Sequence, residues 1–217
     1  FGSDEWGYDD KQTIACTALV QKFTAISVRE DAGVQLCAKH LNTKAIRLLD
    51  PTLMIAKSHY VSLIEKYTDG DNIPKNIFAY FLDPNSFKEG VAEEVRSTLG
   101  CDVDYFNKDK SESEKSNIGD WLKGFQNSAY IVTDSFHGVA FSLIFNKPFI
   151  AIGNLERGLS RFQTILDVFQ LTERLILEGS NHITSIIKKE INYNKINDIL
   201  LSERNKTNAF LTTSLSD

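Results

Sequence analysis

The chain has 217 residues, 42% of them hydrophobic and 24% charged, which is ordinary for a globular protein. Its formal net charge of −5 argues against a nucleic-acid partner, because general nucleic-acid binders are usually basic. No stretch approaches the roughly 18 apolar residues of a membrane span, so we expect none.

Short strands and helices alternate from the start of the chain. Apolar residues at helical spacing predict a helix over 10–23, and residues 25–28 suit a short strand. Arg29 follows this strand directly and opens a second helix that runs to about Leu41. Open α/β sheets bind ligands at such strand ends, although a bare surface arginine explains the local sequence equally well.

The alternation continues through the middle of the chain. A strand over 45–49 ends in Asp50-Pro51, where we expect Asp50 to cap the short helix after the proline. The elements expected next are a helix over 58–67, a strand over 77–82, a helix over 86–99, a strand over 101–106 and a helix over 118–126.

A compact strand–helix–strand unit follows. Residues 130–132 form a short β-branched and aromatic run, and residues 149–152 form a second one. The segment from Phe136 to Phe145 is apolar on nearly all sides, as in a buried helix, and Pro148 prevents its continuation. Such crossovers connect parallel strands, so the unit predicts a parallel sheet.

Polar residues crowd the turn between the first strand and the helix of this unit: Asp134, Ser135, His137 and Gly138. A helix N-terminus offers unpaired N–H groups and a positive dipole end, which together bind anions. Gly138 is expected to let a ligand approach the backbone, and His137 to bond a phosphate or move a proton. A capped helix with an incidental histidine is the alternative.

The last third carries further cations. Arg157 lies in a glycine-containing loop, and Ser160 is expected to cap a helix over 161–170 with Arg161 in its first turn. A cation there opposes the helix dipole, which a bound anion would offset. A short strand over 175–177 and a lysine-rich helical tail from 183 complete the chain.

The segment Thr133–Gly138, with Phe141-Ser142 and the run Asn146–Phe149, resembles the signature of bacterial polysaccharide pyruvyl transferases. The resemblance implies a fold like the two-domain B-type (GT-B) glycosyltransferases. It also implies transfer of a pyruvyl group from phosphoenolpyruvate to a sugar hydroxyl, as a ketal, in capsule or exopolysaccharide biosynthesis. No cofactor is implied, and the acceptor would be a sugar or a lipid-linked saccharide.

The resemblance extends to residues outside this signature. Segment 26–30, the Asp50-Pro51 pair and the Ser160-Arg161 pair are similar to family segments, which favours phosphoenolpyruvate contacts from Arg29 and Arg161. The start of the chain is similar to a segment that follows an N-terminal domain in the family. We therefore expect a C-terminal part of a longer protein, inactive by itself.

The predicted fold class is α/β, with a Rossmann-like, mostly parallel sheet and helices on both faces. We expect three regions, residues 1–70, a donor-binding core over 71–182 and a tail over 183–217, within one compact domain. The polar groups that follow strands would then converge on one crevice. These groups are Arg29, Asp134, Ser135, His137, Arg157 and Arg161.

Several chemistries remain open from the residues alone. We expect no metal site, because the histidines show no ligand spacing, and Cys16, Cys37 and Cys101 favour a reducing cytoplasm. No Gly-x-Ser-x-Gly elbow surrounds Ser135, which argues against a serine hydrolase. In pyruvyl transfer His137 would act as acid or phosphate partner, and Asp134 would orient it or act as base. A nucleotide-sugar glycosyltransferase and a non-enzymatic binding module are the alternatives.

Overall fold

A computed structural model describes residues 5–68, 75–106, 116–153, 158–180 and 183–216. The chain forms two compact units. Unit 1 comprises Phe1–Met54, Asn154–Leu171 and Asn194–Asp217, and unit 2 comprises Ile55–Gly153 and Thr172–Tyr193. The region predicted as a tail therefore contributes to both units.

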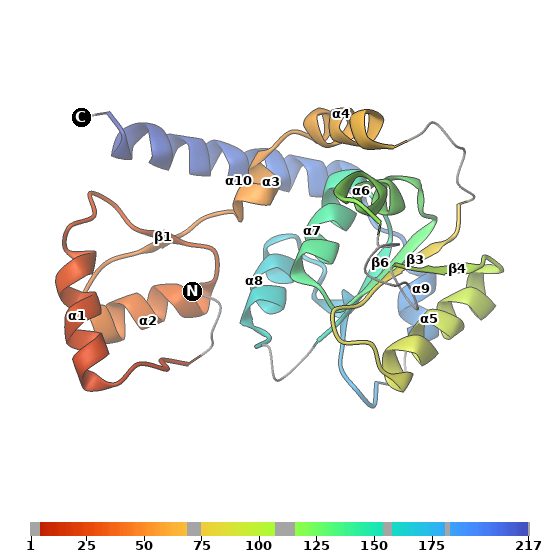
Figure 1. The fold of residues 1–217 in the computed structure, drawn as a ribbon, viewed down its shortest axis with the longest axis horizontal. Helices are drawn as coiled ribbons and strands as arrows, with labels where there is room; N and C mark the ends of the chain where they lie inside the picture. The colour runs from red at the N-terminus through yellow and green to blue at the C-terminus, as the bar shows by residue number, and fades with distance from the viewer. Residues whose placement is uncertain (1–4, 69–74, 107–115, 154–157, 181–182, 217) are drawn as a thin grey trace. The chain divides into compact units, whose positions relative to one another are not determined.

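Unit 2 contains a five-stranded sheet in which every neighbouring pair of strands is parallel (Figure 1). This arrangement confirms the predicted α/β fold class. The strand order is β4-β3-β5-β6-β7. The bounds are β3 (Ile77–Tyr80), β4 (Val103–Tyr105), β5 (Tyr130–Thr133), β6 (Phe149–Ile152) and β7 (Leu175–Ile176).

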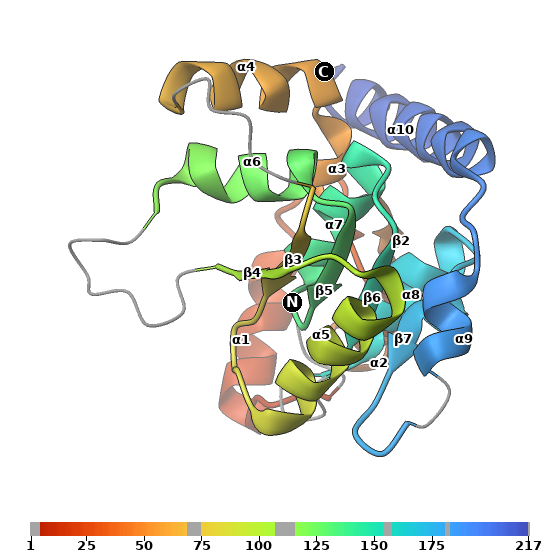
Figure 2. The same cartoon turned by 90° about the vertical axis from the view of Figure 1, so that its right-hand side faces the viewer.

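Helices cover both faces of this sheet. The helical segments of unit 2 are α4 (Lys57–Tyr67), α5 (Ser86–Leu99), α6 (Ile118–Asn127), α7 (Phe136–Phe145), the 3₁₀ turn η3 (Thr172–Arg174) and α9 (Ile183–Lys188). Figure 2 shows α5 and α9 side by side over the sheet. Asn85 caps α5 by accepting from the Lys88 amide at 3.0 Å, and Gly100 ends it at φ 69°.

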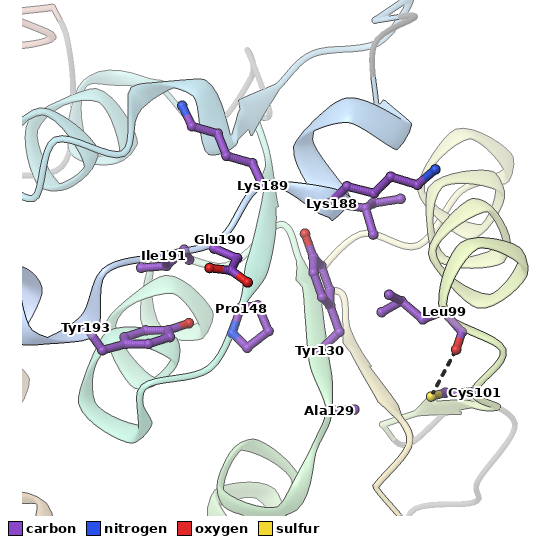
Figure 3. Close-up of a pocket in the computed structure, with 11 residues that line it drawn as sticks. Leu99, Cys101, Ala129, Tyr130, Pro148, Lys188, Lys189, Glu190, Ile191 and Tyr193 are labelled. Atoms are coloured by element: carbon purple, nitrogen blue, oxygen red, sulfur yellow. Dashed lines mark hydrogen bonds between the residues drawn. The ribbon is translucent and has the colours of Figure 1, made fainter.

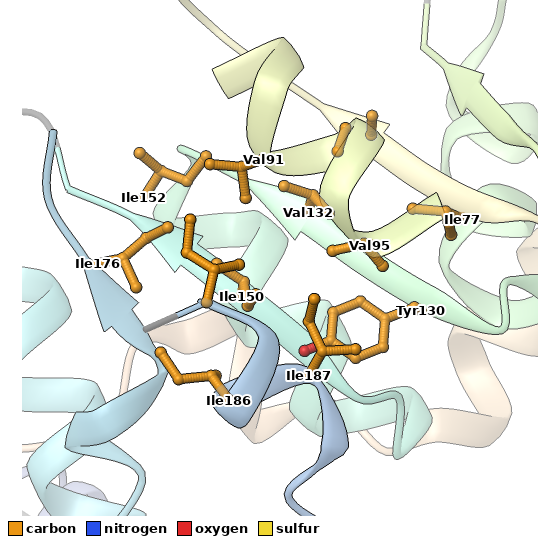
Figure 4. Packing of buried hydrophobic residues seen from close by; sticks show 13 residues of the cluster. Ile77, Val91, Val95, Tyr130, Val132, Ile150, Ile152, Ile176, Ile186 and Ile187 are labelled. Carbon is orange, nitrogen blue, oxygen red and sulfur yellow. The ribbon is translucent and has the colours of Figure 1, made fainter. Parts of the chain in front are cut away.

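The two faces of the sheet carry different cores, as expected from the alternation of side chains along a strand. In β3, Ile77 and Ala79 lie in an aliphatic cluster, whereas Phe78 and Tyr80 pack against aromatic rings of α6. Figure 4 shows the aliphatic cluster between the sheet, α5 and α9. Its labelled members are Ile77, Val91, Val95, Tyr130, Val132, Ile150, Ile152, Ile176, Ile186 and Ile187.

Unit 1 has its own small parallel sheet of two strands, each two residues long. Its elements are α1 (Asp10–Val20), β1 (Ser27–Val28), α2 (Asp31–Leu41), β2 (Ile46–Arg47), α3 (Pro51–Met54), α8 (Ser160–Val168) and α10 (Tyr193–Ser214), whose first residue belongs to unit 2. Arg29 therefore follows a strand of a different sheet from the one that carries Asp134. The expectation that both follow strands of one sheet is wrong, because in the described residues β1 and β2 form a separate two-stranded sheet.

The apolar side chains of α1 are largely exposed, including Ile14 and Leu19, and Phe23 just beyond the helix is exposed as well. Within the described parts of the chain, no helix is both long and apolar enough to cross a membrane.

Candidate active site

Asp134 lies at the carboxyl end of β5, and its carboxylate is held by three donors. The amides of Leu82 and Asp83 donate to its two oxygens at 2.7 and 3.1 Å, and the Lys88 ammonium donates at 2.6 Å. The Lys88 and Asp134 side chains are only 6% and 1% exposed. These bonds hold the loop after β3 and the start of α5 against the end of β5.

Sequence reasoning missed Lys88, although a signal was present. The buried face of α5 is Lys88, Val91, Ala92 and Val95, which is helical spacing for one stripe. A lysine within an apolar stripe requires a buried anion as partner. Lys88 also donates to the carbonyl of Asp83, which lies in the turn after β3. Its ammonium therefore connects α5 with that turn and with the end of β5.

Ser135 occupies the predicted N-cap position of α7, but its side chain makes no capping hydrogen bond to the helix. The Ser135 amide instead donates to the Thr133 hydroxyl at 3.1 Å, and that hydroxyl donates to the Tyr80 carbonyl at 2.8 Å. This network connects the carboxyl ends of β3 and β5. Burial raises the pKa of the Tyr80 phenol, the charge of Asp134 raises it further, and the neighbouring Ser135 side chain lowers it.

The Cβ side of Gly138 is closed by the Thr133 side chain. A Cβ atom at this position would lie 2.2 Å from the Thr133 hydroxyl oxygen and 2.7 Å from its methyl carbon. The space beside its backbone is therefore filled by Thr133 and is not open to a ligand. A ligand therefore cannot approach Gly138 from the side where a Cβ would lie, contrary to expectation, because α7 packs closely on the end of β5 there.

We expect Gly138→Ala to lower the free energy of unfolding by about 1–3 kcal/mol, the range for overpacking a buried site. Gly90→Ala in α5 is the matched control, since nothing lies within 4 Å of an added Cβ there. That variant should be more stable than the wild type by about 1 kcal/mol, from helix propensity alone. Urea denaturation measures both, and a Gly138→Ala variant as stable as the wild type would contradict the packing role.

His137 is exposed, whereas every other residue from 130 to 145 is buried. It is the second residue of α7, and its ring lies edge-on to Phe136 with centroids 5.4 Å apart. A histidine that filled the core would be buried with its neighbours. The exposure of His137 at the start of a ten-residue helix places it where a ligand at the helix N-terminus can reach it.

Arg29 lies in unit 1, where a carboxylate orients its guanidinium. Its Nη1 donates to Asp50 Oδ2 at 2.7 Å, its Nε lies 3.5 Å from Glu30 Oε1, and a third of its side chain (33%) is exposed. Burial would raise the pKa of Asp50, but hydrogen bonds from Thr52 and Arg29 outweigh it and lower the pKa. Asp50 also accepts a hydrogen bond from the Thr52 amide at 2.9 Å, which confirms that it caps α3 as predicted.

Arg161 is the second residue of α8 in the same unit, and its guanidinium carbon lies 6.0 Å from the centre of the Phe162 ring. The prediction that Ser160 caps this helix is wrong. Leu159 is the N-cap residue, and the Ser160 hydroxyl donates to Glu30 Oε2 at 2.9 Å. The buried Glu30 carboxylate, which sequence reasoning missed, thus contacts both the Arg29 side chain and the start of α8.

The candidate residues therefore belong to two units. Asp134, Ser135, His137 and Gly138 lie in unit 2, and Arg29 and Arg161 lie in unit 1. Arg157 lies outside the described residues. The convergence of these groups on a single crevice stays a prediction.

A pocket of about 460 Å³ opens at the end of the five-stranded sheet opposite to Asp134 (Figure 3). It is lined by Leu99, Cys101, Ala129, Tyr130, Pro148, Ile187, Lys188, Lys189, Glu190, Ile191 and Tyr193. Tyr130 is the first residue of β5, whereas Asp134 follows its last residue. The pocket therefore lies at the amino ends of the strands and contains none of the predicted site residues.

Comparisons with known proteins gave one match. A family model described as "Polysaccharide pyruvyl transferase" matches residues 8–156, which is more than half of the chain. The match includes Arg29, Asp134, Ser135, His137 and Gly138 and ends before Arg157 and Arg161. Searches of curated proteins and of solved structures returned no match.

Proposed function

The chain belongs to the polysaccharide pyruvyl transferase family, and from this premise we propose that it moves a pyruvyl group from phosphoenolpyruvate to a sugar hydroxyl. The product is a ketal on a saccharide of a bacterial capsule or exopolysaccharide. The acceptor is a sugar or a lipid-linked saccharide, no cofactor takes part, and the reaction takes place in the cytoplasm.

The observation that carries the proposal is the exposed His137 at the N-terminus of the otherwise buried α7. Phosphoenolpyruvate is a small anion with a phosphate and a carboxylate. The amides and dipole of α7 favour an anion at this place, and an imidazolium beside it adds a charged hydrogen-bond donor.

The reaction has one demanding proton transfer. A proton must reach the methylene carbon of phosphoenolpyruvate while C2 acquires cationic character, and a sugar hydroxyl attacks C2 and gives up its own proton to a base. Phosphate then leaves, and a second hydroxyl closes the ketal with loss of its proton. In the proposed mechanism His137 donates the proton or binds the phosphate. Asp134 orients His137 or acts as the base toward the attacking hydroxyl.

Arg29 and Arg161 supply the remaining cationic contacts in the proposal. A third of the Arg29 side chain is exposed, so a substrate oxygen can reach its guanidinium. We propose that these arginines bind the carboxylate or phosphate of the donor, with Arg157 as a further contact.

We expect Arg29→Ala and Arg161→Ala each to weaken phosphoenolpyruvate binding by about 1.5–3 kcal/mol, the value of a hydrogen bond to a charged group. Titration calorimetry measures the affinity. Arg96→Ala is the matched control, because Arg96 is an exposed arginine paired with Glu93 on α5. Unchanged affinity in both site variants would remove these arginines from the site.

The function itself is tested by phosphate release. Together with an N-terminal domain of the GT-B type, the protein should release phosphate from phosphoenolpyruvate only when a saccharide acceptor is present, and should not hydrolyse nucleotide sugars. We further propose that turnover needs an N-terminal domain of the GT-B type, because donor and acceptor must be held together. Activity with nucleotide sugars alone would favour a glycosyltransferase. Turnover of neither phosphoenolpyruvate nor nucleotide sugars would favour a binding module.

A further inference from the structure

The pocket at the amino ends of the strands lies within unit 2 and is separate from the candidate active site. It is bounded by the end of α5, the start of β5, Pro148 and the segment from Ile187 to Tyr193 (Figure 3). Its volume of about 460 Å³ falls in the range of pockets that hold small organic molecules. We therefore asked which ligand its walls would fit.

Most of the pocket wall is apolar. It includes Leu99, the last residue of α5, whose side chain is 40% exposed. Covering such a surface is favourable for a ligand with an apolar body, because both surfaces are then removed from water. The other apolar or aromatic members of the wall are Ala129, Tyr130, Pro148, Ile187, Ile191 and Tyr193.

A buried cation lies directly behind this wall. The side chain of Arg174 is fully buried, and its Nη1 donates to the Tyr130 hydroxyl at 3.2 Å and to the Phe149 carbonyl at 3.4 Å. Its Nη2 donates to the Lys189 carbonyl. These acceptors are all uncharged, and in the described part of the chain the Arg174 Nε has no hydrogen-bond partner. A guanidinium in such a place favours a nearby anion, since a buried charge is costly without one.

The charges on the pocket wall leave this cation in excess. The wall contains Lys188, Lys189 and Glu190. The Lys189 ammonium lies 2.7 Å from Glu173 Oε1, so Glu173 balances one lysine and Glu190 balances the other. Among these described residues one positive charge, that of Arg174, remains. A ligand with a single negative charge would neutralise it.

Tyr193 supplies a hydrogen-bond donor for such a ligand. Its hydroxyl oxygen is buried and has no hydrogen-bond partner among the described residues. Figure 3 shows this hydroxyl pointing toward Pro148, another residue of the pocket wall. Burial raises the pKa of Tyr193, and the charge of Arg174 offsets only part of the rise. The phenol is thus neutral at neutral pH and keeps its proton for an acceptor.

We propose that this pocket binds a small amphipathic carboxylate. Its apolar body packs against the apolar wall, and a carboxylate oxygen accepts a hydrogen bond from the Tyr193 hydroxyl beside the charge of Arg174. A carboxylate fits the single excess charge, whereas a phosphate dianion would exceed it. This site and its ligand are independent of pyruvyl transfer.

Octanoate is the probe, because it joins one carboxylate to an aliphatic chain, and 1-octanol carries the same chain without the charge. Titration calorimetry of the wild type should show one saturable octanoate site, and 1-octanol should bind about tenfold more weakly or worse. No saturable binding of octanoate, or equal affinity for the two probes, would overturn the proposal.

Tyr193→Phe tests the donor. The variant should bind octanoate about tenfold more weakly, and its affinity for 1-octanol should be unchanged. It should fold like the wild type, since the lost hydroxyl has no partner in the described residues. Tyr67→Phe is the matched control, because Tyr67 is an exposed tyrosine of the same unit outside the pocket. Wild-type octanoate affinity in Tyr193→Phe would contradict the proposed contact.

Leu99→Glu tests the place of binding with a residue whose exposure makes the fold tolerant of the change. A carboxylate at this wall should repel octanoate and weaken its binding about tenfold or more. Leu63→Glu adds the same charge to a leucine of unit 2 that is 38% exposed and lies outside the pocket, and it should leave the affinity unchanged. Equal effects of the two substitutions would place octanoate elsewhere and overturn the proposal. Phosphoenolpyruvate is absent from these titrations, so their outcome does not depend on the proposed function.

Discussion

Lys88→Met should lower the free energy of unfolding by about 3–5 kcal/mol, the usual cost of removing one partner of a buried ion pair. The reason is the environment of Asp134, whose side chain is 1% exposed and accepts the Lys88 ammonium at 2.6 Å. Without Lys88 the carboxylate keeps only its two amide donors. Urea denaturation of the wild type and the variant measures the loss.

Two further variants separate the buried charge from the loss of packing. Arg96→Met removes an exposed arginine from the same helix and should change the stability little. Lys88→Met combined with Asp134→Asn should recover part of the loss, because the amide is neutral and still offers one oxygen to the Leu82 or Asp83 amide. A loss in Lys88→Met no larger than in Arg96→Met would show that the pair contributes nothing to stability.

The elements that the sequence predicted best are those with local signals. The helices over 86–99 and 136–145 match the residues of α5 and α7, since Asn85 and Gly100 mark the ends of the first and an apolar run defines the second. Strand ends were predicted less well. The run over 77–82 forms a strand only to Tyr80, because Leu82 turns to donate its amide to Asp134.

The parts that sequence reasoning missed depend on partners distant in the chain. Glu30 meets Ser160, and Lys88 meets Asp134, and no local pattern identifies such pairs. Gly138 differs, because its neighbour is the Thr133 side chain, which is close in the sequence, but the tight packing of α7 on the end of β5 has no local signature either. The pairing of β1 with β2 alone was also beyond local patterns, since each strand is only two residues long.

These pairs share one consequence for the candidate site. In both units, buried carboxylates hold loops or cations near the candidate residues. Asp134 fixes the turn after β3, and Asp50 and Glu30 contact Arg29. In unit 2 the exposed candidate is His137, and in unit 1 the side chains of Arg29 and Arg161 are each partly exposed.

His137→Ala should lower the turnover of the full-length enzyme that we propose by about 10²-fold or more, as for the loss of a general acid. A bound phosphate favours the imidazolium form, which is the form that gives up a proton. His137→Gln separates two roles, since glutamine donates a hydrogen bond but carries no transferable proton. Turnover lost with phosphoenolpyruvate binding retained would identify His137 as the acid.

The matched control is His59→Ala. His59 is also an exposed histidine in the first turn of a helix, as the third residue of α4, and it belongs to the same unit. Its removal should leave turnover unchanged, because helix position and exposure alone do not make a histidine catalytic. Steady-state phosphate release at saturating phosphoenolpyruvate measures all three variants. Wild-type turnover in His137→Ala would remove this residue from the mechanism, whatever its effect on the affinity for the donor.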